Sequence, residues 1–242
     1  MSLDARTQEL ERNLAAVRER IARACAAAGR DAGEVTLVAV TKTFPADDVV
    51  RLVGLGVRDV AENRDQEARA KVQAVLDSAR PGAADLRWHF VGQLQRNKAA
   101  SVARYADVVH SVDRPALVTA LSRGTVAAGR ELAVLLQLDL DPSGKATGRG
   151  GAAPSQVLEL AEQVQAADGL TLRGVMGVAP LGAPAREAFT RLAAAAAVLR
   201  ERVPDATWMS AGMSTDLEDA VACGATHLRV GSAVLGSRPS LR

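Results

Sequence analysis

The sequence predicts a closed (β/α)₈ barrel, the TIM-barrel fold, as a single domain that covers residues 1–242. Short apolar runs rich in β-branched residues alternate eight times with helix-like segments, which indicates a parallel sheet with helical crossovers. Eight such units in 242 residues match the size of a closed barrel. An open, doubly wound sheet is the alternative, but it normally has fewer strands and a glycine fingerprint in its first turn, where this chain reads "TKTFPADD".

The expected strands are apolar on both faces, as strands of a parallel sheet covered by helices are. The first of them, "VTLVAVT", shows the pattern: β-branched residues dominate the run and polar residues bound it. In chain order, strands are expected at residues 35–41, 57–61, 86–92, 106–111, 132–140, 170–178, 207–210 and 226–231.

An additional amphipathic helix is expected ahead of the first strand, because Leu10, Leu14, Val17 and Ile21 form one apolar stripe. The segments between the strands have helical character in their turn. In chain order, helices are expected at residues 3–28, 46–56, 63–78, 93–103, 114–128, 154–166, 185–202 and 215–223. The glycine-rich segment 141–151 is expected to be a mobile loop at the exit of the fifth strand and not a domain boundary.

Composition excludes several classes of function. Basic and acidic residues number 30 and 28, so the net charge of +2 argues against a nucleic-acid partner. No apolar run approaches the length of a membrane span, and the polar N-terminus has no apolar signal core. The two cysteines, Cys25 and Cys223, are expected to be buried free thiols. These features indicate a cytoplasmic protein with neither a membrane nor a nucleic acid as partner.

Lys42 closes the first expected strand, at the end of the barrel where active sites of this fold lie. Lysine is rare here: it stands only at positions 42, 71, 98 and 145, and the other 26 of the 30 basic residues are arginine. An amine loses its proton when desolvated and attacks an aldehyde, whereas a guanidinium does not. The alternative is a strand-exit lysine that simply reaches water.

Two loops have the composition of an anion-binding site. The loops after the seventh and eighth strands, "SAGMSTD" (210–216) and "GSAVLGS" (231–237), both offer glycine and serine ahead of an expected helix, and barrels often bind phosphate there. Thr215 and Glu218 stand at the spacing of a capping box, which predicts a helix start at this point. Each loop alone is also consistent with an ordinary helix cap.

Arg229 shares a strand face with His227 and Gly231, so it is expected to point into the barrel mouth. A phosphate, a carboxylate or a ring nitrogen would accept hydrogen bonds from Arg229 there. The alternative is an ion pair with an acid such as Asp139 or Glu62. The histidines lack metal-ligand spacing, so no metal site is expected.

His89 lies in the middle of the third expected strand, "RWHFVG". A hydrogen-bonded core histidine is the simplest interpretation of this position, and it places the ring beneath a ligand bound at the mouth.

Taken together, these motifs resemble the YggS/PROSC family of pyridoxal phosphate homeostasis proteins. The resemblance runs through nearly the whole chain, in the pieces "AVTKTFP", "AENRDQEA", "WHFVGQLQRNK", "HSVDR", "GVMGVAP" and "WMSAGMSTDLEDAVACGATHLRVGSAVLG". The first, third and last pieces are highly specific in that order. Two departures from the family pattern are Arg64, where a tyrosine is usual, and Ala211, where a methionine is usual.

The resemblance implies a barrel like the N-terminal domain of bacterial alanine racemases and a site for pyridoxal 5′-phosphate. It implies an aldimine between the cofactor and Lys42, an Arg229 that faces the pyridine nitrogen, and a phosphate held by the two serine loops. The expected cofactor-binding residues are Lys42, Asn63, His89, Ser210, Met213, Ser214, Arg229, Gly231 and Ser232.

The implied function is that of a monomeric protein of cofactor homeostasis, not an enzyme, which holds pyridoxal phosphate and releases it to pyridoxal phosphate-dependent apoenzymes. An arginine at the pyridine nitrogen weakens the ring as an electron sink, which disfavours carbanion chemistry. Three alternatives stay open: a weak amino-acid racemase, a class I aldolase or isomerase acting on a sugar phosphate, and a regulatory binding module.

Overall fold

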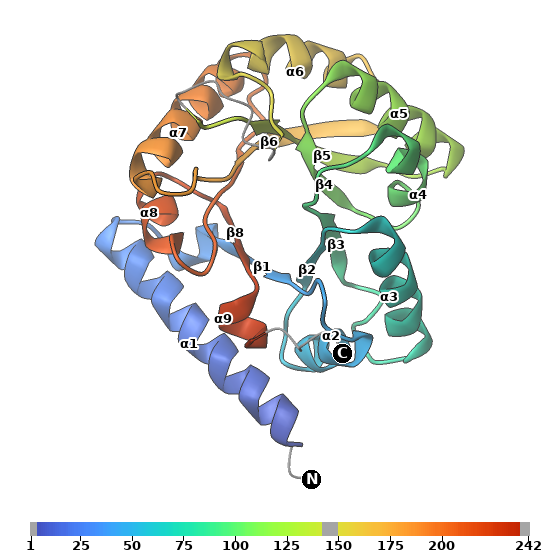
Figure 1. The fold of residues 1–242 in the computed structure, drawn as a ribbon, viewed down its shortest axis with the longest axis vertical. Coiled ribbons are helices and arrows are strands. Elements are labelled where there is room, and N and C mark those ends of the chain that lie inside the picture. Colours follow the sequence, from blue (N-terminus) through green and yellow to red (C-terminus); the bar gives the residue numbers. More distant parts are fainter. Residues whose placement is uncertain (1–3, 142–149, 238–242) are drawn as a thin grey trace.

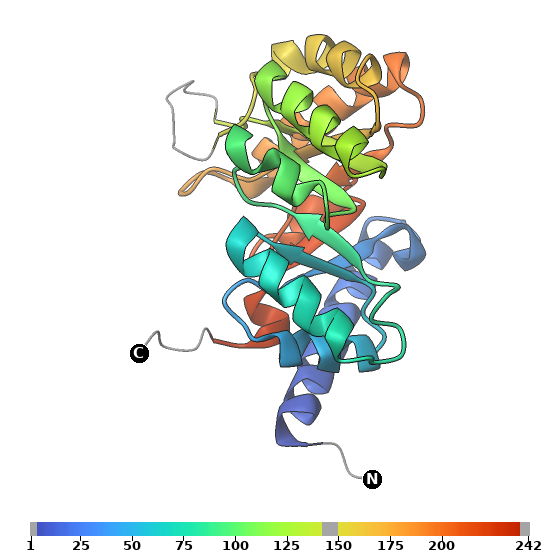
Figure 2. The ribbon, with the colours of Figure 1, turned by 90° about the vertical axis from the view of Figure 1, so that its right-hand side faces the viewer.

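A computed structural model describes residues 4–141 and 150–237 and confirms the predicted barrel. Eight parallel strands pair in chain order, β1 to β8, and the ring closes where β8 pairs with β1 (Figure 1). Figure 2 shows the barrel from the side, with the helices α3, α4 and α5 toward the viewer. No helix in the described ranges is long and apolar enough to span a membrane.

All eight predicted strands form, each within a few residues of its expected bounds. They are β1 (Thr36–Val40), β2 (Asp59–Glu62), β3 (Arg87–Phe90), β4 (Val108–Val112), β5 (Leu132–Leu138), β6 (Leu170–Gly177), β7 (Trp208–Ser210) and β8 (His227–Val230). The α-helices are α1 (Ala5–Ala27), α2 (Ala46–Gly54), α3 (Asp65–Asp77), α4 (Ala99–Val102), α5 (Pro115–Ala127), α6 (Val157–Gln165), α7 (Ala185–Arg202), α8 (Leu217–Ala222) and α9 (Ser232–Leu235). Three short 3₁₀ helices are η1 (Ala32–Glu34), η2 (Arg96–Lys98) and η3 (Pro154–Gln156).

The helix expected over 93–103 is much shorter than predicted. Only η2 and α4 form there, and residues 93–95 have no helical structure. Tertiary contacts explain the difference: Leu94 is buried in the core, and its carbonyl accepts a hydrogen bond of 2.8 Å from Arg114 Nη2. Packing of this segment thus overrides its helical propensity.

The predicted capping box of Thr215 and Glu218 is wrong. Helix α8 begins two residues later than expected, at Leu217. Asp216 accepts the backbone N–H of Met213 at 2.6 Å and closes a tight turn ahead of the helix, while Glu218 forms a salt bridge with Arg20 of α1. Glu218, which would complete the capping box, therefore pairs with helix α1 instead.

The additional helix α1 is present and packs against α2, α8 and α9 (Figure 1). Its side chains bond to the backbone of the last units of the barrel: Asn13 Nδ2 donates to Val234 O at 3.1 Å, and Arg20 Nη1 donates to Ser214 O at 3.1 Å. Residue 3 of the expected helix and residues 142–149 of the expected loop at 141–151 lie outside the described residues. Both cysteines are free; Cys25 is buried as expected, whereas Cys223 is half-buried.

The interior of the barrel combines apolar and polar layers. The apolar core lies mainly between the sheet and the helices, and inside the ring a small cluster of Val38, Val40 and Ala61 packs with Val91. A second small apolar cluster holds Val108, Leu135 and Met176, and buried polar side chains come from β2, β3, β4, β7 and β8. A polar layer of this kind needs mutual hydrogen bonds, because burial of an unpaired polar group is costly.

Candidate functional site

A pocket of about 390 Å³ opens at the carboxyl ends of the strands, within the size range of small-molecule sites. Seven of the nine residues expected to bind a cofactor line it: Lys42, Asn63, Met213, Ser214, Arg229, Gly231 and Ser232. The apolar part of its wall comes from β1, β3 and β6, including Val40, Val91 and Met176. The structure therefore gathers residues far apart in the sequence into one cavity.

Lys42 lies two residues beyond β1, on a segment whose backbone is held on both sides. Lys71 Nζ donates to Thr41 O at 2.8 Å, and Glu67 Oε1 accepts the N–H of Thr43 at 2.6 Å. Thr43 has φ of 71°, a left-handed conformation that non-glycine residues rarely adopt. These contacts fix the direction in which Lys42 leaves the sheet and enters the pocket.

Lys71 belongs to a buried ionic cluster that the sequence did not reveal. Its ammonium group contacts Glu62 at 2.5 Å and Glu67 at 3.1 Å, and Thr41 Oγ1 donates to the same Glu62 oxygen at 2.6 Å. Burial raises the pKa of Glu62, against the attraction of Lys71. The one available signal was the scarcity of lysine, which sets Lys71 apart from the many arginines of the chain.

Asn63 follows β2 and reaches the pocket beside Gly92, which follows β3. A Cβ atom on Gly92 would lie 2.1 Å from the backbone oxygen of Asn63, so only glycine permits this approach. The close contact draws the two strand ends together and sets the position of Asn63 at the pocket wall.

A cluster of hydroxyl groups forms the side of the pocket made by the last two loops. Ser232 Oγ donates to Ser214 Oγ at 3.3 Å, and the N–H of Ala233 donates to the same Ser214 oxygen at 3.3 Å. Thr215 also lines this side, next to Gly231. Hydroxyl and backbone donors in such a group are suited to an anion.

Arg229 lies at the floor of the pocket and is buried in the barrel. It donates to Ser210 Oγ at 2.6 Å and to Gly177 O at 2.9 Å. Burial lowers the pKa of Arg229 to about 10, so the guanidinium stays charged at neutral pH. A guanidinium has five N–H donors, so groups remain on Arg229 for a ligand in the pocket.

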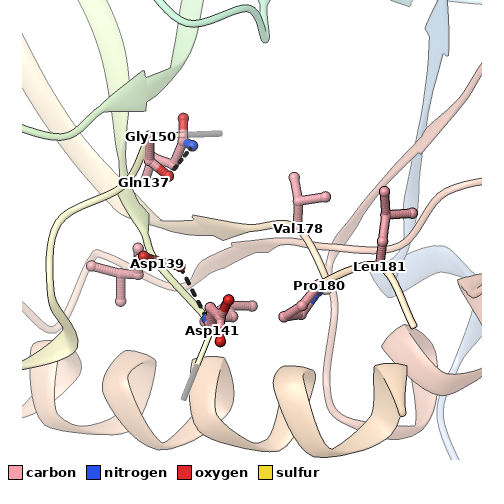
Figure 3. Close-up of a pocket in the computed structure, with 9 residues that line it drawn as sticks. Gln137, Asp139, Asp141, Gly150, Val178, Pro180 and Leu181 are labelled. Atoms are coloured by element: carbon pink, nitrogen blue, oxygen red, sulfur yellow. Dashed lines mark hydrogen bonds between the residues drawn. The ribbon is translucent and has the colours of Figure 1, made fainter. Parts of the chain in front are cut away.

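Within the described part of the chain, Arg229 does not form the alternative ion pair with Asp139 or Glu62. Glu62 is engaged with Lys71, on another part of the barrel wall. Figure 3 shows Asp139 in a smaller neighbouring pocket at the exits of β5 and β6, where its carboxylate accepts the N–H of Asp141 at 3.0 Å. Arg229 is therefore a buried cation whose hydrogen-bond partners among residues 4–141 and 150–237 are neutral.

Ser210 and His89, the other two expected cofactor ligands, are not in the wall of this pocket. Both are buried below it. Ser210 Oγ contacts His110 Nδ1 at 2.9 Å, and His110 Nε2 contacts His89 Nδ1 at 2.8 Å. His89 Nε2 in turn contacts Asp59 Oδ1 at 2.9 Å. His89 is thus the hydrogen-bonded core histidine that its mid-strand position predicted.

Electrostatics agree with neutral rings at His110 and His227 and with an ionised acid at Asp59. Burial, followed by the neighbouring His89 and Arg229, lowers the pKa of His110 well below its usual value. Burial also lowers the pKa of His227 to about 3. At Asp59, burial works against ionisation, but hydrogen bonds from His89 and Arg87 outweigh it and lower the pKa.

Comparison with known proteins places this site in context. Residues 10–239 match the family model for the N-terminal domain of alanine racemase. A pyridoxal phosphate homeostasis protein of Mycobacterium tuberculosis (strain ATCC 25618 / H37Rv) is 46% identical over 243 residues, covering 96% of this chain and 94% of the relative. One from Escherichia coli (strain K12) is 36% identical and covers 95% and 97%.

Among solved structures, PipY of Synechococcus elongatus PCC7942 with PLP bound superposes with a TM-score of 0.79 at 34% identity. The match covers 94% of this chain and all of PipY. The similarity therefore extends over essentially the whole of both molecules.

Proposed function

Since this chain belongs to the family of pyridoxal phosphate homeostasis proteins, we propose that it binds pyridoxal 5′-phosphate in the pocket of Lys42 and serves in the homeostasis of that cofactor. The PLP-bound structure of PipY, similar over its full length, supports this proposal. One observation carries it: an amine, a buried guanidinium and a cluster of hydroxyl groups line the same cavity.

The donor set of the pocket fits the three polar parts of this cofactor. When bound, pyridoxal phosphate supplies an aldehyde, with which an amine condenses while water leaves. Lys42 provides the amine, Arg229 provides donors for the pyridine nitrogen, and Ser214 and Ser232 provide hydroxyl groups for the phosphate. Met213 and Gly231 complete the loops around that phosphate, and Asn63 lies beside the ring.

Arg229 suits retention of the cofactor better than catalysis. A charged guanidinium only donates hydrogen bonds, so it favours the unprotonated state of the pyridine nitrogen. An unprotonated ring is a weaker electron sink, which disfavours removal of a proton from an attached amino acid. Reversible attachment at Lys42 needs no such sink and proceeds in either direction.

We propose that the protein is a carrier without an enzymatic activity of its own, monomeric and cytoplasmic, with pyridoxal phosphate-dependent apoenzymes as recipients. Its relatives bear the name of homeostasis proteins. The only tyrosine, Tyr105, lies in the connection between α4 and β4, against the hydrophobic core and outside the pocket wall. A racemase needs an acid or base on each face of the substrate, and Lys42 supplies only one.

The test is to identify the residue that carries the cofactor. Purified protein is incubated with pyridoxal phosphate, its visible spectrum is recorded before and after borohydride, and the labelled peptide is mapped. We expect the label on Lys42 and its loss in Lys42→Ala, with thermal unfolding unchanged. Lys98→Ala is the matched control, since Lys98 is an exposed lysine on the same face of the barrel. A label on Lys71, Lys98 or Lys145 instead would refute the proposal.

A further inference from the structure

A line of hydrogen bonds runs through the barrel from the pocket floor to the opposite end of the sheet. It begins at Arg229, passes through Ser210, His110 and His89, and ends at Asp59, the first residue of β2. All five side chains are buried. The line thus connects the pocket with the amino-terminal end of the barrel, where Asp59 also pairs with Arg87.

The two ends of this line fix its direction. The guanidinium of Arg229 can only donate, so Ser210 Oγ accepts from it. The carboxylate of Asp59 can only accept when ionised, so His89 carries a proton on Nε2. Protons therefore point away from Arg229 at one end and toward Asp59 at the other.

One arrangement of protons satisfies every group between these ends. A neutral His89 with its proton on Nε2 has a free lone pair on Nδ1, which accepts the Nε2–H of His110. His110 then has a lone pair on Nδ1, which accepts the hydroxyl proton of Ser210. Each donor meets one acceptor, and every hydrogen bond in the line points from Arg229 toward Asp59.

The competing arrangement leaves a buried group unsatisfied. If His89 carried a second proton, His110 would donate from Nδ1 to Ser210 Oγ, which already accepts from Arg229. The hydroxyl proton of Ser210 would then have no acceptor among the contacts of the described residues, at the cost of an unpaired buried donor. It would also place a second cation in the interior that already holds Arg229.

We propose that Ser210, His110 and His89 are positioning residues that form a one-way line of hydrogen bonds and hold the Arg229 guanidinium toward the ring nitrogen of the bound cofactor. This inference rests on the proposed function, because it assigns Arg229 to the cofactor ring. It also gives Ser210 a different task from the one its sequence suggests: its hydroxyl group both accepts and donates inside the barrel and is not a phosphate ligand.

The direction of the line can be tested without any cofactor. In protein labelled with ¹⁵N-histidine, long-range ¹H–¹⁵N correlation spectra distinguish the two neutral tautomers from the cation, and single His→Gln variants assign the three rings. At pH 7.5 we expect both His89 and His110 as neutral Nε2–H tautomers. A proton on Nδ1 of either ring would overturn the proposal. This result stands or falls independently of whether pyridoxal phosphate binds.

The role of Ser210 is tested by comparing two ligands, pyridoxal phosphate and pyridoxal, by absorbance titration. If Ser210 positions Arg229, Ser210→Ala weakens binding of both ligands by the same factor, about tenfold for the loss of one hydrogen bond to a charged group. Ser232→Ala, at the hydroxyl cluster, weakens pyridoxal phosphate selectively. Ser111→Ala is the matched control, since Ser111 is a buried serine of β4 whose hydroxyl group has no partner among the described residues.

These outcomes distinguish failure of the positioning role of Ser210 from failure of the proposed function. If Ser210→Ala weakens pyridoxal phosphate far more than pyridoxal, Ser210 is a phosphate ligand and the positioning role is wrong. If the wild-type protein binds neither ligand, the proposed function fails, while the tautomer measurement still decides the direction of the line. If Ser210→Ala does not fold, His110→Ala interrupts the line one step further from the pocket and is expected to weaken binding of both ligands by the same factor, whereas unchanged affinities would overturn the positioning role.

Discussion

Lys71 and Glu62 form a buried ion pair of 2.5 Å directly behind the segment that carries Lys42. Both side chains are almost fully excluded from water. Buried pairs of this kind contribute little net stability as a unit, but loss of one partner leaves an uncompensated charge in the interior. The pair therefore links the stability of the barrel to the placement of Lys42.

Lys71→Met is expected to destabilise the protein by about 3 kcal/mol, because Glu62 loses its counter-charge. Urea unfolding at pH 7.5, followed by circular dichroism, measures this change. Lys98→Met removes an exposed lysine and is expected to change stability by less than about 0.5 kcal/mol. A similarly small effect of Lys71→Met would show that the protein does not depend on the buried pair for its stability.

Gly92→Ala is expected to impair both folding and cofactor binding, since its Cβ atom would lie 2.1 Å from Asn63 O. Relief of that clash moves Asn63 or the end of β3, at a cost of at least about 1 kcal/mol. Thermal unfolding and titration with pyridoxal phosphate report the two effects. Gly33→Ala, at a glycine with ordinary space around it, is the control and should leave both unchanged.

The double variant Ser214→Ala/Ser232→Ala is expected to discriminate against the phosphate group. Loss of the two hydroxyl groups removes charge-assisted hydrogen bonds, each worth about 1.5–3 kcal/mol. Binding of pyridoxal phosphate should fall by at least tenfold, whereas binding of unphosphorylated pyridoxal should change little. Equal weakening of the two ligands would place the phosphate elsewhere.

Stability is expected to fall as the pH drops below about 6.5. His110 and His227 both have folded-state pKa values lowered by burial, that of His227 to about 3. They stay neutral in the folded protein, whereas the unfolded chain takes up their protons near pH 6.5. The loss therefore begins at the unfolded pKa and continues toward pH 3, with a slope of up to about 1.4 kcal/mol per pH unit for each ring.

Urea unfolding at pH 7.5, 6.0 and 5.0 measures this slope, at pH values above the ordinary pKa of aspartate and glutamate side chains. His227→Gln removes one of the two rings and should reduce the slope by about half. An unchanged slope in that variant would mean that His227 does not contribute to the pH dependence of stability.

Amino-acid racemisation is expected to be absent or far slower than in an enzyme. Cofactor-loaded protein is incubated with L-alanine in deuterium oxide, and exchange at the α-carbon is followed by NMR. Turnover at a typical enzymatic rate, on the order of 1 s⁻¹ or faster, would show that the carrier proposal is wrong. Lys42→Ala serves as the blank for non-enzymatic exchange.

The sequence predicted the order of the strands and most of the pocket, because both follow from local patterns. Apolar runs between helices mark the strands of a parallel barrel, and the barrel brings its strand ends to one face. Lys42, Arg229 and the two serine loops could therefore be placed before the structure was known. Short-range signals were sufficient for these features.

Local sequence patterns could not predict the contacts between distant segments of the chain. The line from Ser210 through His110 joins residues 100 positions apart, and nothing local to Ser210 distinguishes a hydroxyl group inside the barrel from one at a phosphate loop. The helix expected over 93–103 is likewise shortened by a contact with Arg114, which lies 20 residues beyond Leu94 in the sequence. Lys71 was visible only as a rare residue type, and its burial with Glu62 required the packing of α3 on the sheet.

Helix α1 bonds to the backbone at Val234 and Ser214, so it supports loops that are synthesised much later than the helix itself. On the ribosome, α1 emerges long before either partner exists. The ring cannot close until β8 is available to pair with β1. A nascent chain therefore completes this pocket only after β8 has emerged and paired with β1.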